Sequence, residues 1–224
     1  MPGHPFDLVI FDCDGVLVDS EGLSAKVLIG MLAEQGVAVD FDYFCVNFLG
    51  RSFPTVAADI RANFAAALPP DFEATYRARL LDEFTQHLTA SPGIEAVLAS
   101  MAVPFCLATS SSPPRCLHSL RATGLLAQFD GRIFTASEVA RGKPHPDLFL
   151  HAASRMGVDP SRCLVIEDSL PGIAAARAAG MEVIRYTGGS HLRARQLKHD
   201  EDVRVFTNWD MFPQILFQWG RPAA

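Results

Sequence analysis

Two aspartates directly follow a short apolar run near the start of the chain. Residues 8–11 are apolar and partly β-branched, as in a strand covered on both faces, and Asp12 and Asp14 come next, with Gly15 behind them. At neutral pH a carboxylate is already an anion that can attack phosphorus. A neighbouring carboxyl group can give a proton to the leaving alkoxide and take one from water. A capped turn or a solvated loop explains the same pattern.

Hydroxyl groups follow the next predicted strand, at 104–108. The segment from Thr109 to Ser112 offers hydroxyls and free backbone N–H groups at the start of a helix, which suits a bound phosphate. Thr109 and Ser110 are the candidates to contact it. An ordinary helix cap at Ser112 is the alternative interpretation.

One lysine stands in an unusual setting. The chain has only three lysines, and Lys143 lies between Gly142 and Pro144, on a loop rigid enough to aim its ammonium group. There it could hold an anionic nucleophile and a transferring phosphoryl group together. A solvated surface lysine is the alternative.

Two adjacent acids, Glu167 and Asp168, follow a further predicted strand at 163–166. Buried acids are costly unless a cation pairs with them, and a hard divalent ion with oxygen ligands would serve. Asp168 with Asp12 could bind Mg²⁺, although Asp168 or Ser169 could also cap the next helix. Four such polar groups, each directly after an apolar strand, together favour one phosphoryl-transfer site.

The elements that must position these residues follow an α/β pattern. Alternating strands and helices imply a doubly wound parallel sheet, whose ligands sit at the carboxyl ends of the strands. Strands are expected at 8–11, 104–108, 133–135, 163–166, 182–186 and 203–206. Helices are expected at 21–35, 53–67, 72–88, 94–101, between Ser112 and Gly124, and at 146–156, 169–179 and 211–217.

A run of helices interrupts the alternation after the first strand. Residues 21–88 contain helical patterns and no convincing strand, so we expect an inserted helical domain there. The core domain would then comprise 1–20 and 89–224, and the short polar connections at 19–21 and 89–92 would act as hinges.

The composition limits the possible partners. The chain has 224 residues, 49% of them hydrophobic, a formal charge of -6 and a pI near 5.6, which argues against a nucleic-acid partner. No apolar run approaches the roughly 20 residues that span a bilayer, so no membrane partner is expected. Five scattered cysteines and no N-terminal basic-then-apolar segment point to a reducing cytoplasm. We expect a soluble monomer or weak homodimer.

Taken together, the motifs resemble the haloacid dehalogenase superfamily, in its helical-cap group that includes β-phosphoglucomutases and sugar phosphatases. The resemblance covers essentially the whole chain. It implies that Asp12 is the nucleophile and Asp14 the general acid/base, and that Thr109 and Lys143 position the phosphoryl group. It also implies a Mg²⁺ site. The matching segments are DCDGVLVDS at 12–20, Thr109, GKPHPD at 142–147 and IEDSLPGIAAARAAGM at 166–181, and the implied Mg²⁺ ligands are Asp12, the Asp14 carbonyl and Asp168, with Glu167 in the outer shell.

The resemblance also ranks the possible reactions. Dehalogenases of the superfamily lack the second aspartate, so Asp14 argues for phosphoryl transfer. Mutases usually have a histidine where this chain has Ser24, and this difference argues against mutase activity. Phosphonate-cleaving members use a cap lysine to form a Schiff base. Lys26 is the only lysine in this cap, and we do not assign it that role. The expected activity is therefore Mg²⁺-dependent hydrolysis of a small phosphorylated metabolite, such as a sugar or sugar-alcohol phosphate, with Arg51 and Glu21 as candidates for substrate binding. A phosphosugar mutase is the alternative, and a catalytically silent binding module a more remote one.

Overall fold

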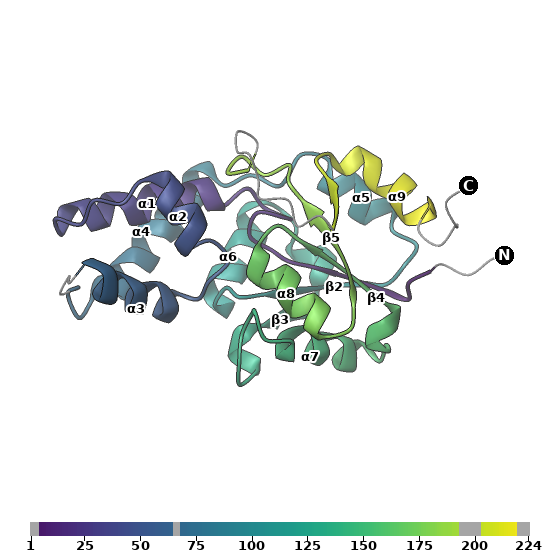
Figure 1. The fold of residues 1–224 in the computed structure, drawn as a ribbon. Coiled ribbons are helices and arrows are strands. Elements are labelled where there is room, and N and C mark those ends of the chain that lie inside the picture. Colours follow the sequence, from purple (N-terminus) through teal and green to yellow (C-terminus); the bar gives the residue numbers. More distant parts are fainter. Residues whose placement is uncertain (1–4, 65–67, 193–202, 219–224) are drawn as a thin grey trace.

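The computed structural model describes residues 5–64, 68–192 and 203–218, and in them a parallel sheet carries the fold (Figure 1). Six strands run in the order β3-β2-β1-β4-β5-β6, and every neighbouring pair is parallel. This confirms the doubly wound α/β class. The strands are β1 (Leu8–Phe11), β2 (Phe105–Thr109), β3 (Ile133–Thr135), β4 (Cys163–Glu167), β5 (Glu182–Tyr186) and β6 (Arg204–Phe206).

Helices cover both faces of the sheet, and the side chains of successive strand residues point to opposite faces. Val9 and Phe11 pack in one cluster with helices α5, α6 and α9, whereas Leu8 and Ile10 pack in another with α7 and α8. Because both faces are covered, β1, β2 and β4 are buried along their whole length, which is why they are continuous apolar runs. The helices are α5 (Ile94–Ser100), α6 (Pro113–Ala122), α7 (Asp147–Met156), α8 (Leu170–Ala178) and α9 (Phe212–Gln218), with 3-10 turns η1 (Leu126–Phe129), η2 (Ala136–Glu138), η3 (Pro160–Arg162) and η4 (Trp209–Met211).

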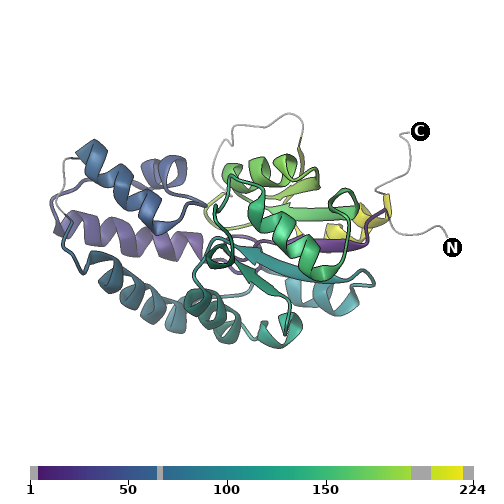
Figure 2. The same ribbon diagram turned by 90° about the horizontal axis from the view of Figure 1, so that it is seen from below.

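The helices that lie between β1 and β2 in the sequence form a group beside the sheet in both views (Figures 1 and 2). The expected helix at 53–67 ends at Phe64 among the described residues, and 65–67 lie outside them. The second helix of the group was not predicted, because its seven residues are too few for a clear helical period. The group comprises α1 (Glu21–Glu34), α2 (Phe41–Asn47), α3 (Phe53–Phe64) and α4 (Phe72–His87).

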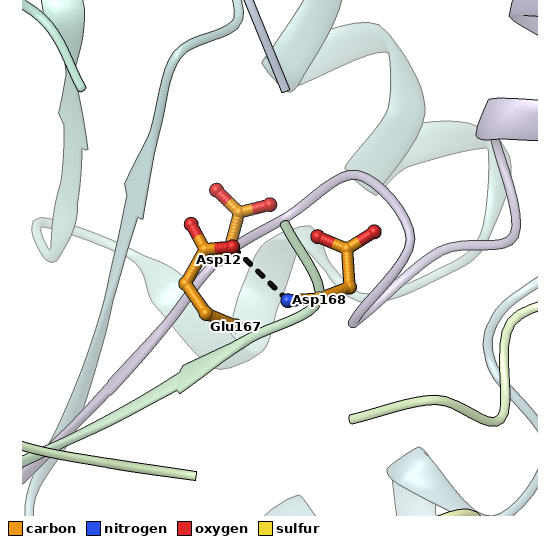
Figure 3. A group of neighbouring side chains, drawn as sticks. All are labelled: Asp12, Glu167 and Asp168. Carbon is orange, nitrogen blue, oxygen red and sulfur yellow. Dashed lines mark hydrogen bonds between the residues drawn. The ribbon is translucent and has the colours of Figure 1, made fainter. Parts of the chain in front are cut away.

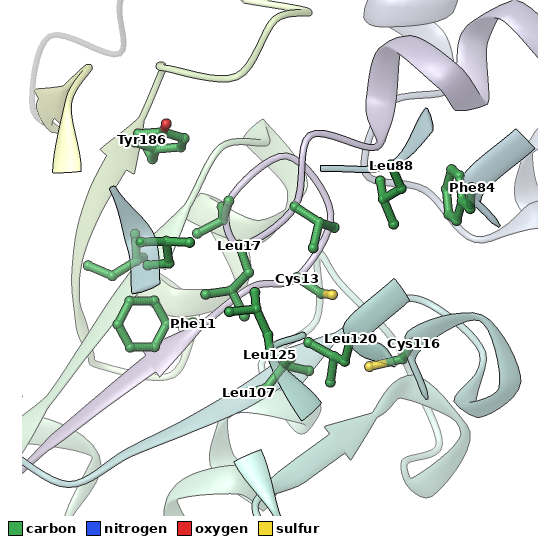
Figure 4. Close-up of a cluster of buried hydrophobic side chains, with 14 of the residues drawn as sticks. Phe11, Cys13, Leu17, Phe84, Leu88, Leu107, Cys116, Leu120, Leu125 and Tyr186 are labelled. Carbon is green, nitrogen blue, oxygen red and sulfur yellow. The ribbon is translucent and has the colours of Figure 1, made fainter. Parts of the chain in front are cut away.

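The two chain segments that lead into and out of this helical group run side by side. Val18 and Ala90 form an antiparallel bridge, and the Asp19 N–H donates to the Thr89 carbonyl at 3.0 Å. One apolar cluster continues from the sheet past these segments into the helices, through Leu17, Leu88 and Phe84 (Figure 4). The division into a core and an inserted domain at 20/21 and 88/89 remains a prediction.

Candidate active site

The polar residues singled out from the sequence meet at the carboxyl ends of the central strands. Phe11 of β1 is in register with Leu107 of β2 and Ile166 of β4, so the residues that follow these positions share one edge of the sheet. The Asp12 N–H donates to the Ile166 carbonyl at 3.0 Å, which fixes Asp12 beside the end of β4. The order of the strands reverses beside β1, and ligands of doubly wound sheets usually bind at the carboxyl ends of the strands next to such a reversal.

Three carboxylates cluster at this edge (Figure 3). Asp12, Glu167 and Asp168 are buried, and one oxygen of each lies within 4.8 Å of those of the other two. Burial, reinforced by the neighbouring carboxylates, raises the pKa of both Asp12 and Asp168 well above the usual range. Hard oxygen donors in this excess of negative charge fit a divalent cation such as Mg²⁺.

Each carboxylate of the cluster is held in place by further contacts. Glu167 Oε2 accepts the N–H groups of Asp168 and Ser169, both at 3.0 Å, and the Ser169 hydroxyl at 2.9 Å. Ser169 is also the N-cap of α8, because its Oγ accepts the Gly172 N–H, so the cap and the acidic cluster coexist. Asp168 Oδ2 lies 2.9 Å from Nε2 of His191, a contact that the sequence did not suggest because His191 lies in a loop far along the chain.

Lys143 is the cation of the cluster. Its Nζ donates to Asp12 Oδ1 at 2.6 Å, to Glu167 Oε1 at 2.7 Å and to the Ala108 carbonyl at 3.1 Å. Burial alone would lower the pKa of Lys143, but Asp12 and Glu167 outweigh burial and the net shift is upward. Only 2% of its side chain is exposed, so it is not a solvated surface lysine.

Asp14 lies in a different electrostatic environment from Asp12. Burial would raise the pKa of Asp14, but Arg115 together with hydrogen bonds from Ser111 and Ser20 holds it below the usual range. Arg115 Nη2 lies 2.8 Å from Asp14 Oδ1, and Ser20 Oγ donates to the same oxygen at 2.6 Å. Asp12 and Asp14 therefore lie in different electrostatic environments, the first beside Lys143 and two further carboxylates and the second beside Arg115.

Arg115 was missed by sequence reasoning. It occupies the third position of α6, directly after the segment of hydroxyl residues, and its Nη2 also donates to Ser24 Oγ at 3.1 Å. The signal available was its place in the first turn of a helix that starts at a strand end. Ser112 precedes α6 as expected, but its hydroxyl makes no cap hydrogen bond and instead accepts from Arg77 Nη1 at 3.0 Å.

A cavity of about 560 Å³ opens over these groups, between the strand ends and the helices α1 to α4. Thr109, Ser110, Glu21 and Arg51 all line it, and their contacts with a substrate stay a prediction. Lys26 is absent from its lining and instead pairs with Glu83 at 2.6 Å. Besides Arg51, its wall on the helical side includes apolar side chains of Leu28, Phe44, Phe48, Phe53, Val56, Tyr76 and Leu80.

Gly50 brings the helical group into direct contact with the acidic end of the cavity. Its φ is +72°, and a Cβ at this position would lie 2.7 Å from both Cβ and Oγ of Ser169. Real Cβ atoms do not approach other heavy atoms so closely, so this contact requires glycine. Gly36, at φ +75°, offers a comparison because a Cβ there meets nothing within 4 Å.

Glu21 is a buried acid whose side chain has no hydrogen-bond partner among the described residues. Burial and the nearby Asp14 raise its pKa to about 8. Because the folded pKa exceeds the ordinary value of 4.5, Glu21 favours folding below pH 4.5, and this contribution is lost as pH rises through 8. We therefore expect Glu21→Gln to stabilise the chain at pH 9 by at least about 2 kcal/mol relative to its effect at pH 4.5, at about 1.4 kcal/mol per pKa unit.

Urea unfolding at the two pH values, in metal-free buffer, measures this difference. Glu95→Gln, at an exposed position of α5, is the control and should show no comparable gain at pH 9. Equal effects of Glu21→Gln at both pH values would contradict a raised pKa.

Together, a sheet whose strand order reverses beside β1, two aspartates at the end of β1 and a buried lysine are typical of an α/β enzyme of the phosphoryl-transfer type. Residues 6–180 match the family model of the haloacid dehalogenase-like hydrolases. The chain belongs to this family, which confirms the resemblance inferred from its motifs and the expectation of an enzyme.

Curated relatives and solved structures agree with this assignment. The chain is 29% identical to 6-phosphogluconate phosphatase of Escherichia coli, over 93% of this chain and 94% of that protein. It is 32% identical to fructose-1-phosphate phosphatase of the same organism, over 79% of this chain and 94% of that protein. A haloacid dehalogenase-like protein from Agrobacterium tumefaciens superposes with a TM-score of 0.83 at 33% identity, covering 96% of this chain and 100% of that one. Among the described residues, no helix is long and apolar enough to cross a membrane.

Proposed function

We propose that the protein is a Mg²⁺-dependent phosphatase that hydrolyses a small sugar or sugar-alcohol phosphate through an aspartyl phosphate on Asp12. One observation carries this proposal: the Asp12 carboxylate lines the cavity, held by Lys143 at 2.6 Å, and Asp14 lines the same cavity two residues further along, paired with Arg115. The names of the relatives support a phosphorylated sugar or sugar acid as the substrate class.

The proposed reaction has two steps. Asp12 attacks the phosphorus in line, the bond from phosphorus to the ester oxygen breaks, and Asp14 gives its proton to the departing alkoxide. Asp14, now a carboxylate, takes a proton from water, whose oxygen attacks the phosphorus and releases phosphate from Asp12. The contacts of Asp14 with Arg115, Ser111 and Ser20 favour its carboxylate, the form that takes the proton in the second step, and oppose the acid form that the first step uses.

The other groups bind and orient the phosphoryl group. Lys143 neutralises Asp12 before the attack and contacts the charge that develops on the phosphoryl oxygens. The Thr109 hydroxyl lines the cavity at the end of β2 and accepts the Ser111 N–H at 3.0 Å, which fixes its orientation. Asp12, Asp168 and the Asp14 carbonyl would hold Mg²⁺, with Glu167 in its outer shell. The bound ion would supply positive charge to the phosphoryl oxygens.

The position at which related mutases place a histidine supports hydrolysis over mutase activity. Ser24 is buried there, with its hydroxyl donating to the Ser20 carbonyl at 3.0 Å and accepting from Arg115. A serine in these contacts has no proton that titrates near neutral pH, so nothing at this position withholds water from the phosphoenzyme until substrate arrives.

Phosphate release from a panel of sugar, sugar-alcohol and sugar-acid phosphates, with Mg²⁺ and with EDTA, tests this function. We expect release with Mg²⁺ and at least a hundredfold loss in EDTA. Inert protein across the whole panel would refute the phosphatase. Conversion of β-glucose 1-phosphate to glucose 6-phosphate without loss of phosphate would favour the mutase instead.

Gly50→Ala should reduce turnover without unfolding the protein. The added Cβ cannot fit against Ser169, so the loop must withdraw from the acidic cluster, and we expect kcat/KM to fall at least about tenfold. Gly36→Ala introduces the same left-handed strain with no contact within 4 Å, and should keep kcat/KM within about twofold. Steady-state kinetics with urea unfolding separates the two effects. Equal kinetics of the two variants would contradict a role for this contact.

A further inference from the structure

The charged residues that line the cavity divide into two groups. Asp12, Lys143, Glu167 and Asp168 belong to the phosphoryl end, and Asp14 is paired with Arg115. The remaining charged side chains of the lining, among the described residues, are Arg51, Arg77 and Glu21. Away from the phosphoryl end, the cavity lining therefore holds two arginines and one acid, and Arg77 is also paired with Glu73 outside the lining.

Among the described residues, Arg51 has no partner for its guanidinium group. It lies in the loop between α2 and α3, lines the cavity, and makes no side-chain hydrogen bond or ion pair with any described residue. An arginine that faces a cavity without a counter-ion is suited to bind an anion from solution, in particular a planar carboxylate or a phosphate.

Arg77 lies on α4 and is held toward the core. Its Nη1 donates to Ser112 Oγ at 3.0 Å, three residues beyond Thr109 at the phosphoryl end, while Nε and Nη2 bond Glu73 at 2.9 and 2.6 Å. Glu73 does not line the cavity, so its charge lies behind the guanidinium group rather than inside the binding space. The serine contact thus keeps a cation near the strand ends.

These two arginines identify a feature of the substrate. We propose that Arg51 and Arg77 form a subsite for a second anionic group, a carboxylate or a second phosphate, on the leaving-group side of the phosphate ester. The inference rests on the proposed phosphatase function and narrows its substrate class from neutral sugar phosphates to acidic ones. Arg115 is not part of the subsite, because it is paired with Asp14 at the phosphoryl end.

Matched substrates test the subsite. In two pairs, 6-phosphogluconate with glucitol 6-phosphate and 3-phosphoglycerate with glycerol 3-phosphate, only a terminal carboxylate is exchanged for a hydroxymethyl group. A third pair, fructose 1,6-bisphosphate with fructose 1-phosphate, tests a second phosphate. We expect kcat/KM to favour the acidic member at least tenfold in one pair or more, and the pair that responds identifies the anion.

Variants link any preference to the two arginines. Arg51→Gln and Arg77→Gln should each reduce the preference, measured as the ratio of kcat/KM for the acidic member to that for the neutral member, at least threefold, chiefly through KM for the acidic member. Arg77→Lys should restore part of the preference. Arg61→Gln, an exposed arginine on α3 outside the cavity lining, is the control and should keep it.

The outcomes separate this inference from the proposed function. Hydrolysis of neutral esters with no preference in any pair would overturn the subsite and leave the phosphatase intact. A preference that survives both arginine substitutions would also overturn it. Absence of phosphate release from every ester would refute the phosphatase and the subsite together.

Discussion

Asp12→Asn is expected to reduce phosphate release at least about 10⁴-fold while the chain still folds. The amide has nearly the shape of the carboxylate but is neutral and a poor nucleophile, so the aspartyl phosphate cannot form. Stability should not suffer in metal-free buffer, because burial opposes ionisation of Asp12 and Lys143 keeps Glu167 as its partner. Phosphate release under saturating Mg²⁺ and thermal unfolding measure the two properties.

Asp82→Asn, an exposed acid of α4, is the control for this substitution and should leave both properties unchanged. A related effect concerns the metal: Mg²⁺ should raise the unfolding temperature of the wild type more than that of Asp12→Asn, since one of three clustered carboxylates is lost. Turnover of Asp12→Asn within tenfold of the wild type would exclude Asp12 as the nucleophile.

Lys143→Met is expected to destabilise the protein by about 3 kcal/mol and to abolish turnover. Lys143 is the shared partner of Asp12 and Glu167, whose side chains are 9% and 1% exposed, and without it two buried carboxylates lack a counter-ion. Without Lys143, the pKa of Asp12 in the folded state would be raised further. The deficit should therefore be small below about pH 4, where acids are protonated even when unfolded, and should grow as pH rises.

Arg141→Met is a matched control, because Arg141 lies two residues before Lys143 and pairs with Asp147 at the surface, with 59% of its side chain exposed. It should cost less than about 1 kcal/mol. Urea unfolding from pH 4 to pH 8 in EDTA gives both values. A Lys143→Met deficit that is independent of pH, or no larger than that of Arg141→Met, would contradict the account of the buried ion pairs.

The parts of the site that could be predicted are those tied to the ends of apolar runs. Strand residues are buried on both faces, so the polar residue that ends each run marks the carboxyl edge of the sheet, and parallel order brings Asp12, Thr109 and Asp168 together. Lys143 was predictable because lysine is scarce and its neighbours are glycine and proline.

The residues that escaped prediction depend on packing across long separations. Arg115 reaches Asp14 over 101 positions, and its direction is set by the rotation of α6 against the helical group, where its guanidinium lies 5.4 Å from the Phe84 ring. His191 reaches Asp168 only because a loop after β5 returns over the strand ends. Neither orientation is encoded in local spacing. Likewise α2, with seven residues, is too short for a helical period to be recognised in its sequence.

The pairing of the two segments around Val18 and Ala90 has a consequence for how such a protein can change. Because Val18 and Ala90 form a bridge, residues 19–89 between them leave and re-enter the sheet domain at one point, as the residues of a tight hairpin turn do. Loop closure costs rise only slowly with the number of residues enclosed. The intervening segment could therefore be lengthened, shortened or exchanged for another during evolution with little disturbance to the strands. The proposed substrate contacts of the helices and the proposed chemistry at the strand ends can then change separately.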